Sequence, residues 1–311
     1  MTHQALTIVV LTFNEEANIR ACLDSLTGVG APVFVVDSGS KDRTLEILAG
    51  YDVTVVDHPF ANYAAQRNWA QANIPWATDW VLHLDAGETC LPALNQWLRT
   101  GFDASTTAAD GYLLARRAVF MGRWIKHGGY HPIYHLRLYR IGSGRCEAKV
   151  YDQHFVCAGT TATVPAGADL ADGVMANLRD FTTAHARWAV FEAIETLRSE
   201  TESGDVPADF FGSPIERRRW FKVNVFGRVP ILLRSILYFL HRYVIKLGFL
   251  DGRRGLIFHA LQGLWFRFLV DSMIYEMRRE LNGGDLDEVV LRKYGIDVGA
   301  LLAFVPTEAN D

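Results

Sequence analysis

The sequence predicts an α/β fold, a mostly parallel sheet flanked by helices, because strand and helix patterns alternate through its first hundred residues. Residues 6–12 read LTIVVLT, a continuous β-branched apolar run that is typical of a strand buried on both faces of a parallel sheet. Three apolar residues at helical spacing follow (Ile19, Leu23 and Leu26), and we expect Asn14 to cap their helix. Strands joined by helical crossovers are parallel.

The same alternation continues along the chain. We expect further strands at residues 33–36, 53–56 and 80–84, and helices at residues 44–48 and 64–72. Shorter strand patterns then extend the sheet: residues 111–114, 136–139 and 155–158. Helical patterns dominate beyond residue 169, so we predict an α/β domain at residues 1–165 and a helical C-terminal region at residues 166–311.

The composition excludes several classes of protein. Half of the 311 residues are hydrophobic, too many for a disordered chain, and the net charge of −4 argues against a nucleic-acid partner. The four cysteines match no zinc-binding spacing, so we expect reduced thiols (Cys22, Cys90, Cys146 and Cys157). No basic region precedes the first apolar run, which predicts a strand rather than a signal peptide, and hence a cytoplasmic protein.

Residues 216–271 differ from the rest of the chain in charge. They hold eleven Lys and Arg against three acidic residues, interleaved with aromatic side chains, and no stretch is apolar enough to span a bilayer. Such a basic amphipathic segment is typical of helices that lie on an anionic membrane surface. We therefore expect a protein held peripherally at the inner face of the cell membrane. A packed helical subdomain with a solvated basic face and a subunit interface are the alternatives.

Polar residues cluster just past three of the expected strand ends, at residues 12–15, 37–40 and 85–88. Any one cluster could be an ordinary turn or helix cap, but ligands of open α/β sheets bind outside the carboxyl ends of the strands. The chain has no P-loop, and Val33 stands where a dinucleotide fingerprint needs its third glycine. A bound nucleotide would therefore be held by side chains at the strand ends.

An ordered series of motifs covers most of the chain: residues 12–15 (TFNE), 35–40 (VVDSGS), 66–68 (QRN), 84–88 (LDAGE), 151–155 (YDQHF) and 248–252 (GFLDG). The series resembles the family 2 glycosyltransferases of GT-A fold, in particular the bacterial branch that builds lipopolysaccharide core and other surface glycans. The resemblance implies an inverting transferase that moves a sugar from a nucleotide sugar, most often a UDP sugar, to a glycan or glycolipid acceptor.

The resemblance assigns the nucleotide sugar to these residues: Thr12, Phe13, Asn14, Glu15, Asp37, Ser38, Gln66, Arg67, Asn68 and Asp85. Asp37 would accept the N3–H of uracil or hold the ribose. Arg67 offers a forked cation that suits a diphosphate, and Gln66 and Asn68 would add hydrogen bonds. An exposed charge on a helix is the alternative for Arg67.

The resemblance also implies a divalent metal, Mg²⁺ or Mn²⁺, held against the two phosphates by an Asp-any-Asp motif. Asp85 corresponds to the first carboxylate, but Gly87 stands where the second usually lies. One expectation is a metal held by Asp85 with Glu88 and His154. The others are metal-independent transfer, in which Arg67 and further cations hold the diphosphate, and loss of activity.

An inverting transferase needs a general base for the acceptor hydroxyl. By match with the acidic motif on the acceptor side of the family we expect Asp152 to be this base, with Glu147 as the second candidate. The glycine-rich and basic residues 127–132 (HGGYHP) predict an acceptor loop that meets phosphate groups of a glycolipid, or a plain turn.

Two other classes of protein compete with a transferase. Gly87 would fit a catalytically impaired nucleotide-sugar-binding or scaffold homologue. A nucleotidyltransferase would need a glycine-rich, basic phosphate loop directly after the first strand, where this chain has Phe-Asn-Glu-Glu at residues 13–16.

Overall fold

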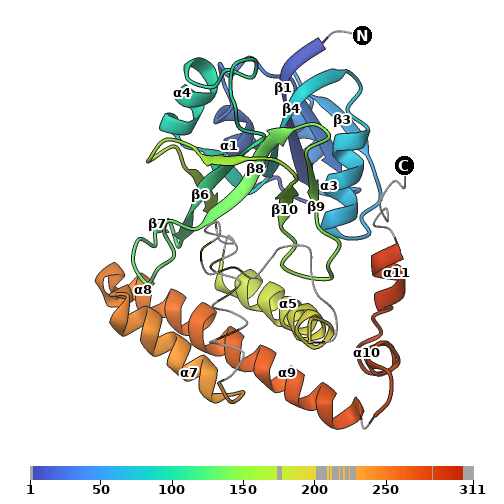
Figure 1. Cartoon of the computed structure of the whole chain (residues 1–311), viewed down its shortest axis with the longest axis vertical. Coiled ribbons are helices and arrows are strands. Elements are labelled where there is room, and N and C mark those ends of the chain that lie inside the picture. Colours follow the sequence, from blue (N-terminus) through green and yellow to red (C-terminus); the bar gives the residue numbers. More distant parts are fainter. Residues whose placement is uncertain are drawn as a thin grey trace. The chain divides into compact units, whose positions relative to one another are not determined.

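The computed structural model describes residues 3–173, 177–200, 209, 211, 217, 220, 224, 229–281 and 283–303 (Figure 1). The chain forms two compact units. The first consists of Met1–Val119, Pro132–Glu147 and His154–Val174. The second consists of Phe120–His131, Ala148–Gln153 and Met175–Asp311. The chain therefore leaves the first unit twice and returns to it before it enters the helical region.

Four parallel strands form one half of the sheet in the first unit: β1 (His3–Thr12), β2 (Val33–Asp37), β3 (Thr54–Asp57) and β4 (Ala77–Asp85). Their order is β3-β2-β1-β4. The register places Thr12 beside Asp37, and Leu11 beside Asp85. The α/β prediction is confirmed, and because the strands are parallel and in this register, the polar clusters that follow them lie at the same end of the sheet.

Beyond β4 the sheet is mixed, and its order continues as β4-β8-β6-β12-β5. The further strands are β5 (Glu88–Cys90), β6 (Gly111–Phe120), β8 (Tyr134–Arg140), β11 (Thr161–Thr163) and β12 (Leu170–Gly173). Strand β8 runs antiparallel to both β4 and β6, while β11 and β12 run parallel to β6. A separate antiparallel pair consists of β9 (Gly144–Cys146) and β10 (Phe155–Cys157).

The helices of the first unit are α1 (Ile19–Asp24), α2 (Thr44–Leu48), α3 (Tyr63–Ala72) and α4 (Pro92–Thr100). Its core contains fully buried side chains from the central strands, among them Ile8, Val10, Trp80, Leu82 and Leu138. Burial of each such side chain stabilises the fold by about 1.5–3 kcal/mol. All four cysteines are free thiols, in agreement with the sequence prediction.

Asn14 does not cap a helix, so that prediction is wrong. Helix α1 begins at Ile19, and its N-cap residue is Asn18, which makes no side-chain capping bond. Asn14 instead adopts a left-handed backbone conformation, with φ of 54°, and its side-chain oxygen accepts a hydrogen bond from the backbone N–H of Lys41 at 2.7 Å. A left-handed conformation is tolerated by asparagine and ends the strand in a turn. Asn14 therefore joins the first two polar clusters.

The second unit is helical in its described part, apart from the short β7 (Arg123–Trp124). Its helical segments are α5 (Leu178–Arg198), α7 (Leu233–Leu240), η2 (His241–Ile245), η3 (Gly248–Asp251), α8 (Gly252–Phe258), η4 (His259–Trp265), α9 (Phe266–Leu281), α10 (Leu286–Tyr294) and α11 (Val298–Ala303). Helices α5 and α9 bury a common core in which Ala189 and Ala193 lie with Phe266 and Ile274. No helix within the described residues has the length and apolar character needed to cross a membrane.

Candidate active site

The turn after β2 is organised by the carboxylate of Asp37, which is 1% exposed. This carboxylate accepts hydrogen bonds from the backbone N–H groups of Gly39 at 2.9 Å and Ser40 at 2.8 Å, and from the Ser40 hydroxyl at 2.5 Å. The backbone N–H of Ser38 donates to the carbonyl oxygen of Thr12 at 3.0 Å. Asp37 thus holds its own turn in shape, and its contact with a base or ribose stays a prediction.

The turn after β1 is tied to the same region by backbone donors. The N–H of Asn14 donates to the Ser40 hydroxyl at 2.8 Å, and the N–H of Glu15 donates to the Thr44 hydroxyl at 2.7 Å. Burial raises the pKa of the Glu15 carboxyl, and neighbouring acidic groups add to the effect. Phe13 stays 55% exposed between these anchored residues. An exposed aromatic ring at the strand ends can stack on a flat ligand such as a nucleotide base.

Two arginines hold Asp85 at the end of β4. Arg67 on α3 donates from Nη2 to both carboxylate oxygens, at 3.0 and 3.1 Å, and Arg137 on β8 donates from Nη2 to Oδ2 at 3.3 Å. The Phe155 ring lies 5.1 Å from the Arg67 guanidinium carbon and 5.8 Å from that of Arg137. Both guanidinium groups are therefore fixed by an ion pair and an aromatic ring.

The same network continues through Glu88, which is 1% exposed. Its carboxylate accepts from Arg137 Nη2 at 2.7 Å and from the backbone N–H of Asp85 at 3.0 Å. Arg116 Nη1 lies 3.7 Å from Glu88 and 3.3 Å from the carboxylate of Asp172. Three guanidinium groups thus alternate with three carboxylates at this edge of the sheet, which satisfies the rule that buried charges are paired.

The proximity of these charges decides the protonation states. Burial by itself would raise the pKa of Asp85, but the positive charges of Arg67 and Arg137 outweigh it and hold that pKa well below its usual range. Burial raises the pKa of Glu88 in spite of the opposing charge of Arg137. Burial and the same two arginines lower the pKa of His83 far below its ordinary value. Asp85 is therefore ionised at neutral pH, and His83 is an uncharged imidazole.

The side chains of Gln66 and Asn68 make hydrogen bonds within the protein. The Gln66 amide nitrogen donates to the Ser38 hydroxyl at 3.1 Å, which ties α3 to the turn after β2. The Asn68 side chain donates to the carbonyl oxygen of Cys146 at 2.9 Å and accepts from its N–H at 2.8 Å, which ties α3 to β9. These contacts fix the helix that carries Arg67, whereas contacts of the two amides with a diphosphate stay predictions.

The expected metal ligands do not gather. In the parts of the chain that the structure describes, no three His, Cys, Asp or Glu side chains form a group that could hold a metal ion. Glu88 is engaged by Arg137, and His154 is paired through Nδ1 with Glu147 Oε1 at 3.0 Å. Asp85 remains, and its nearest polar neighbours are guanidinium groups. Because these donors repel a cation, the residues present do not fit a divalent ion.

The two candidate bases have different surroundings. Glu147 belongs to the first unit, is 1% exposed, and accepts both the backbone N–H and the ring nitrogen of His154 at 3.0 Å. Asp152 belongs to the second unit, is exposed, and has a left-handed backbone with φ of 56°. The sequence motif favoured Asp152 over Glu147, and which of them acts as the base stays a prediction.

Two residues of the charge network carried little signal in the sequence. In a strand, Arg137 lies on the opposite face from Leu136 and Leu138, but only the structure shows that Arg137 reaches both Asp85 and Glu88. Asp172 lies on β12, a strand that the sequence pattern did not predict, and its carboxylate meets Arg116. Long-range pairing of strands brings these residues together, and no local pattern encodes it.

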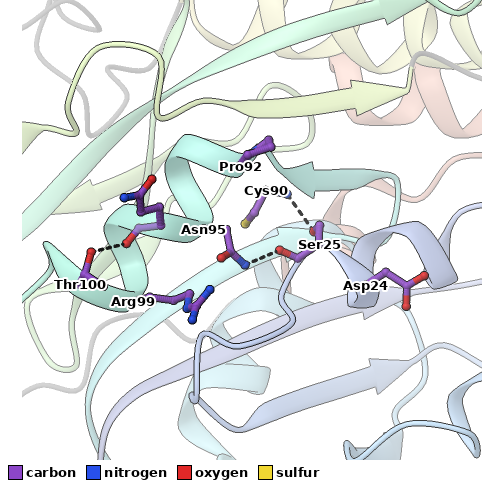
Figure 2. Close-up of a pocket in the computed structure, with 8 residues that line it drawn as sticks. Asp24, Ser25, Cys90, Pro92, Asn95, Arg99 and Thr100 are labelled. Atoms are coloured by element: carbon purple, nitrogen blue, oxygen red, sulfur yellow. Dashed lines mark hydrogen bonds between the residues drawn. The ribbon is translucent and has the colours of Figure 1, made fainter.

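A cavity of about 610 Å³ lies elsewhere in the first unit, between the end of α1, β5 and α4 (Figure 2). Asn95 donates from its amide to the carbonyl oxygen of Ser25 at 2.8 Å, and the backbone N–H of Cys90 donates to the Ser25 hydroxyl at 3.0 Å (Figure 2). The residues that line it include none of the candidate donor-site residues described above. This cavity is therefore distinct from the strand-end site.

Comparison with known proteins identifies the class. The model of the family "Glycosyl transferase family 2" matches residues 7–168, just over half of the chain, and these residues include the strands that carry Asp37, Asp85 and Arg137. The chain therefore belongs to glycosyl transferase family 2. The family expected from the motifs is confirmed.

Among curated relatives, an uncharacterized glycosyltransferase of Rickettsia typhi is 34% identical over 79 residues, which are 25% of this chain and 26% of that protein. The succinoglycan biosynthesis protein ExoA of Rhizobium meliloti is 26% identical over 189 residues, covering 50% of this chain and 55% of that protein. The matches thus span between about a quarter and half of the relatives' length.

Among solved structures, residues 1–349 of TarS from S. aureus cover 89% of this chain and 92% of that chain, with a TM-score of 0.45 and 14% identity. Glucosyl-3-phosphoglycerate synthase from Mycobacterium tuberculosis, solved with Mn²⁺, UDP and glucosyl-3-phosphoglycerate, covers 37% of this chain and 44% of that chain, with a TM-score of 0.30 and 22% identity.

Proposed function

We propose that this chain transfers a sugar from a nucleotide sugar, a UDP sugar in the first instance, to a glycan or glycolipid acceptor in the synthesis of a cell-envelope polysaccharide. The observation that carries the proposal is the pair of guanidinium groups, Arg67 and Arg137, fixed at the carboxyl ends of the parallel strands of a family 2 chain. The name of ExoA supports an extracellular or envelope polysaccharide as the product. Lipopolysaccharide is the form that the sequence motifs favour.

The reaction that follows is a direct displacement. The acceptor hydroxyl oxygen forms a bond to the anomeric carbon, the bond from that carbon to the diphosphate oxygen breaks, and the nucleoside diphosphate leaves with the electron pair. A carboxylate takes the hydroxyl proton. We propose Asp152 for this role, because it is exposed, whereas Glu147 is buried and already accepts hydrogen bonds from His154.

Charge on the leaving diphosphate is the largest electrostatic demand of the reaction, and we propose that arginine side chains meet it. Arg137 Nη1 is buried and has no hydrogen-bond partner among the described residues, so the network still has an N–H group to satisfy. A guanidinium group binds phosphate oxygens in a fixed fork and does not lose its charge at any physiological pH. Asp85 then orients Arg67 and Arg137 and is no metal ligand.

We also propose that the second unit meets the anionic inner face of the cell membrane. Large apolar side chains along α7, η2 and η3 are exposed: Leu233, Ile236, Leu237, Leu240, Val244, Ile245, Leu247, Phe249 and Leu250. Basic side chains accompany them, and this combination of apolar and cationic groups favours a surface with acidic headgroups. A lipid-linked acceptor would be reached there.

Calorimetric titration tests the donor and the metal together. UDP, GDP and their sugars are titrated into wild type and into Gly87→Asp, with Mn²⁺ or with a chelator. A Cβ at Gly87 would meet nothing within 4 Å, so the variant can restore the second carboxylate without a clash. We expect UDP and a UDP sugar to bind wild type equally with and without Mn²⁺, and to bind Gly87→Asp more tightly when Mn²⁺ is present.

Three other results of this titration would change the assignment. Binding to wild type that requires Mn²⁺ would mean that Asp85 does hold a metal together with the phosphates. Absence of binding for every nucleotide sugar would contradict the proposed function. Tight binding of a donor without transfer to any acceptor would favour a scaffold protein, the alternative that Gly87 raises.

A further inference from the structure

The second unit contains cations that its acidic side chains do not neutralise. Arg234 is paired with Asp271, with Nε to Oδ1 at 2.7 Å, and Arg267 is paired with Glu192. Four cations in η2 and α8 or next to them have no carboxylate partner among the described residues (Arg242, Lys246, Arg253 and Arg254). Positive charge therefore accumulates on this part of the surface.

Arg242 is the most constrained of these cations. Its guanidinium carbon lies 3.7 Å from the centre of the Tyr130 ring, and its Nη1 donates to the Tyr238 hydroxyl. Its Nε and Nη2 atoms are buried and have no hydrogen-bond partner among the described residues. The Nε–Nη2 edge is the side of the guanidinium fork that binds two oxygens of one anion, so Arg242 is held with that edge unused.

A turn of two glycines borders this edge. Gly128 and Gly129 have φ of 72° and 69°, and the N–H of Gly128 donates to the carbonyl oxygen of Lys246 at 2.8 Å. A Cβ on Gly128 would lie 2.0 Å from Cε1 of the buried His259, so no side chain fits there. A Cβ on Gly129 would lie 4.0 Å from Arg242 Nη2 and 3.9 Å from Lys246 Cγ, with nothing nearer. A Cβ at Gly129 would therefore make ordinary van der Waals contacts with the side chains of Arg242 and Lys246, so this turn lies directly beside both cations.

We propose that Arg242, Lys246 and the Gly128–Gly129 turn form a binding site for the phosphate group of a membrane lipid. A planar fork and a mobile ammonium group beside a glycine turn suit a phosphate monoester or diphosphate. This inference rests on the proposed function in one respect, since the lipid would be the one that carries the sugar acceptor.

The neighbours of Lys246 favour a lipid over a soluble phosphate. Val244 is 48% exposed, Ile245 is 68% exposed and Leu247 is 47% exposed. If the ligand were a soluble anion, these apolar side chains would stay in contact with water. At a membrane headgroup, they would be buried among acyl chains. Charge and apolar exposure therefore indicate the same kind of ligand.

Vesicle binding tests the site without any transfer reaction. The full chain is mixed with phosphatidylcholine vesicles that contain either phosphatidic acid, a phosphate monoester, or phosphatidylglycerol, a diester, at matched surface charge. We expect wild type to prefer phosphatidic acid. Arg242→Gln and Lys246→Gln should each reduce this preference about tenfold, because each removes a charged hydrogen-bond donor to the phosphate.

Arg254→Gln is the matched control, because it removes the same charge from the same segment outside the proposed site. It should weaken binding to both kinds of vesicle equally and leave the preference intact. The Lys246 side chain is exposed, so Lys246→Gln tests the site even where Arg242→Gln loses its packing on Tyr130.

Three results would overturn the proposal. The first is a wild type without preference for the monoester. The second is a preference that Arg254→Gln abolishes as fully as Lys246→Gln, since general surface charge would then explain it. The third is competition by inorganic phosphate at matched ionic strength, which would assign the site to a soluble anion. Nucleotide-sugar binding, measured on the same variants, distinguishes each result from failure of the proposed function.

Discussion

Two regions of this protein, the strand ends of the first unit and the segment around η2 and α8 of the second, differ in how their positive charges are paired. At the strand ends of the first unit, Arg67, Arg137 and Arg116 each lie against a carboxylate. Around η2 and α8 of the second unit, Arg242 and Lys246 have no such partner among the described residues. Paired arginines are rigid and hold a site in shape, whereas unpaired cations on a surface attract an anionic partner. The paired arginines thus position the residues of a site, whereas the unpaired cations attract an anionic ligand to the surface.

Removal of Arg137 should give the largest effect, because it breaks the balanced network. Arg137→Met leaves the carboxylate of Glu88 buried, with Arg116 as its nearest cation at 3.7 Å. We expect the free energy of unfolding to fall by about 3–5 kcal/mol, the cost of an uncompensated buried charge. Urea denaturation at neutral pH measures this loss.

The double variant Arg137→Met with Glu88→Gln is the control. It removes the stranded charge, so it should recover most of the lost stability. A double variant as unstable as Arg137→Met alone would show that packing of the arginine, and not charge balance, supports the strand ends.

The pKa of His259 is sensitive to the positive charge in the second unit. The ring is fully buried, and burial, followed by the positive charge of Arg242, lowers the pKa of His259 to about 4, against a smaller opposing effect of Asp251. The folded state therefore binds this proton less readily than the unfolded state, so stability is lost as pH falls from 6.5 toward 4. We expect a loss of about 2 kcal/mol at about pH 5 relative to pH 7.5 from this group.

His259→Phe keeps a ring and removes the titration, so its unfolding free energy should depend less on pH over this range. Urea denaturation of both proteins at several pH values gives the difference. Parallel pH profiles for wild type and His259→Phe would exclude His259 as the source.

Arg254→Gln should give the smallest effect on stability. The side chain is exposed and has no carboxylate partner in the described part of the chain, so its removal should change the free energy of unfolding by less than about 0.5 kcal/mol. Thermal denaturation measures the change. A loss approaching that of Arg137→Met would show that the cations of the second unit are structural.

Local sequence patterns predicted the parallel half of the sheet well. Residues 44–48 form α2 with the expected bounds, and the run that ends at Asp37 forms β2, because buried strands and short amphipathic helices have strong periodicity. The patterns failed for Asn14, where a left-handed turn replaced the expected cap. They also did not indicate that Asp85 forms ion pairs with two arginines, because the pair with Arg137 depends on β8 lying beside β4.

The crossing of the chain between the units limits how the protein can be divided. Phe120–His131 and Ala148–Gln153 belong to the second unit, although each is inserted between segments of the first. Strand β12, which carries Asp172 to Arg116, begins at Leu170, beyond the end of the family match. A shortened chain that ends at residue 168 would lack a member of the charge network. In recombination between homologues, therefore, no single cut in the sequence exchanges one unit and leaves the other whole.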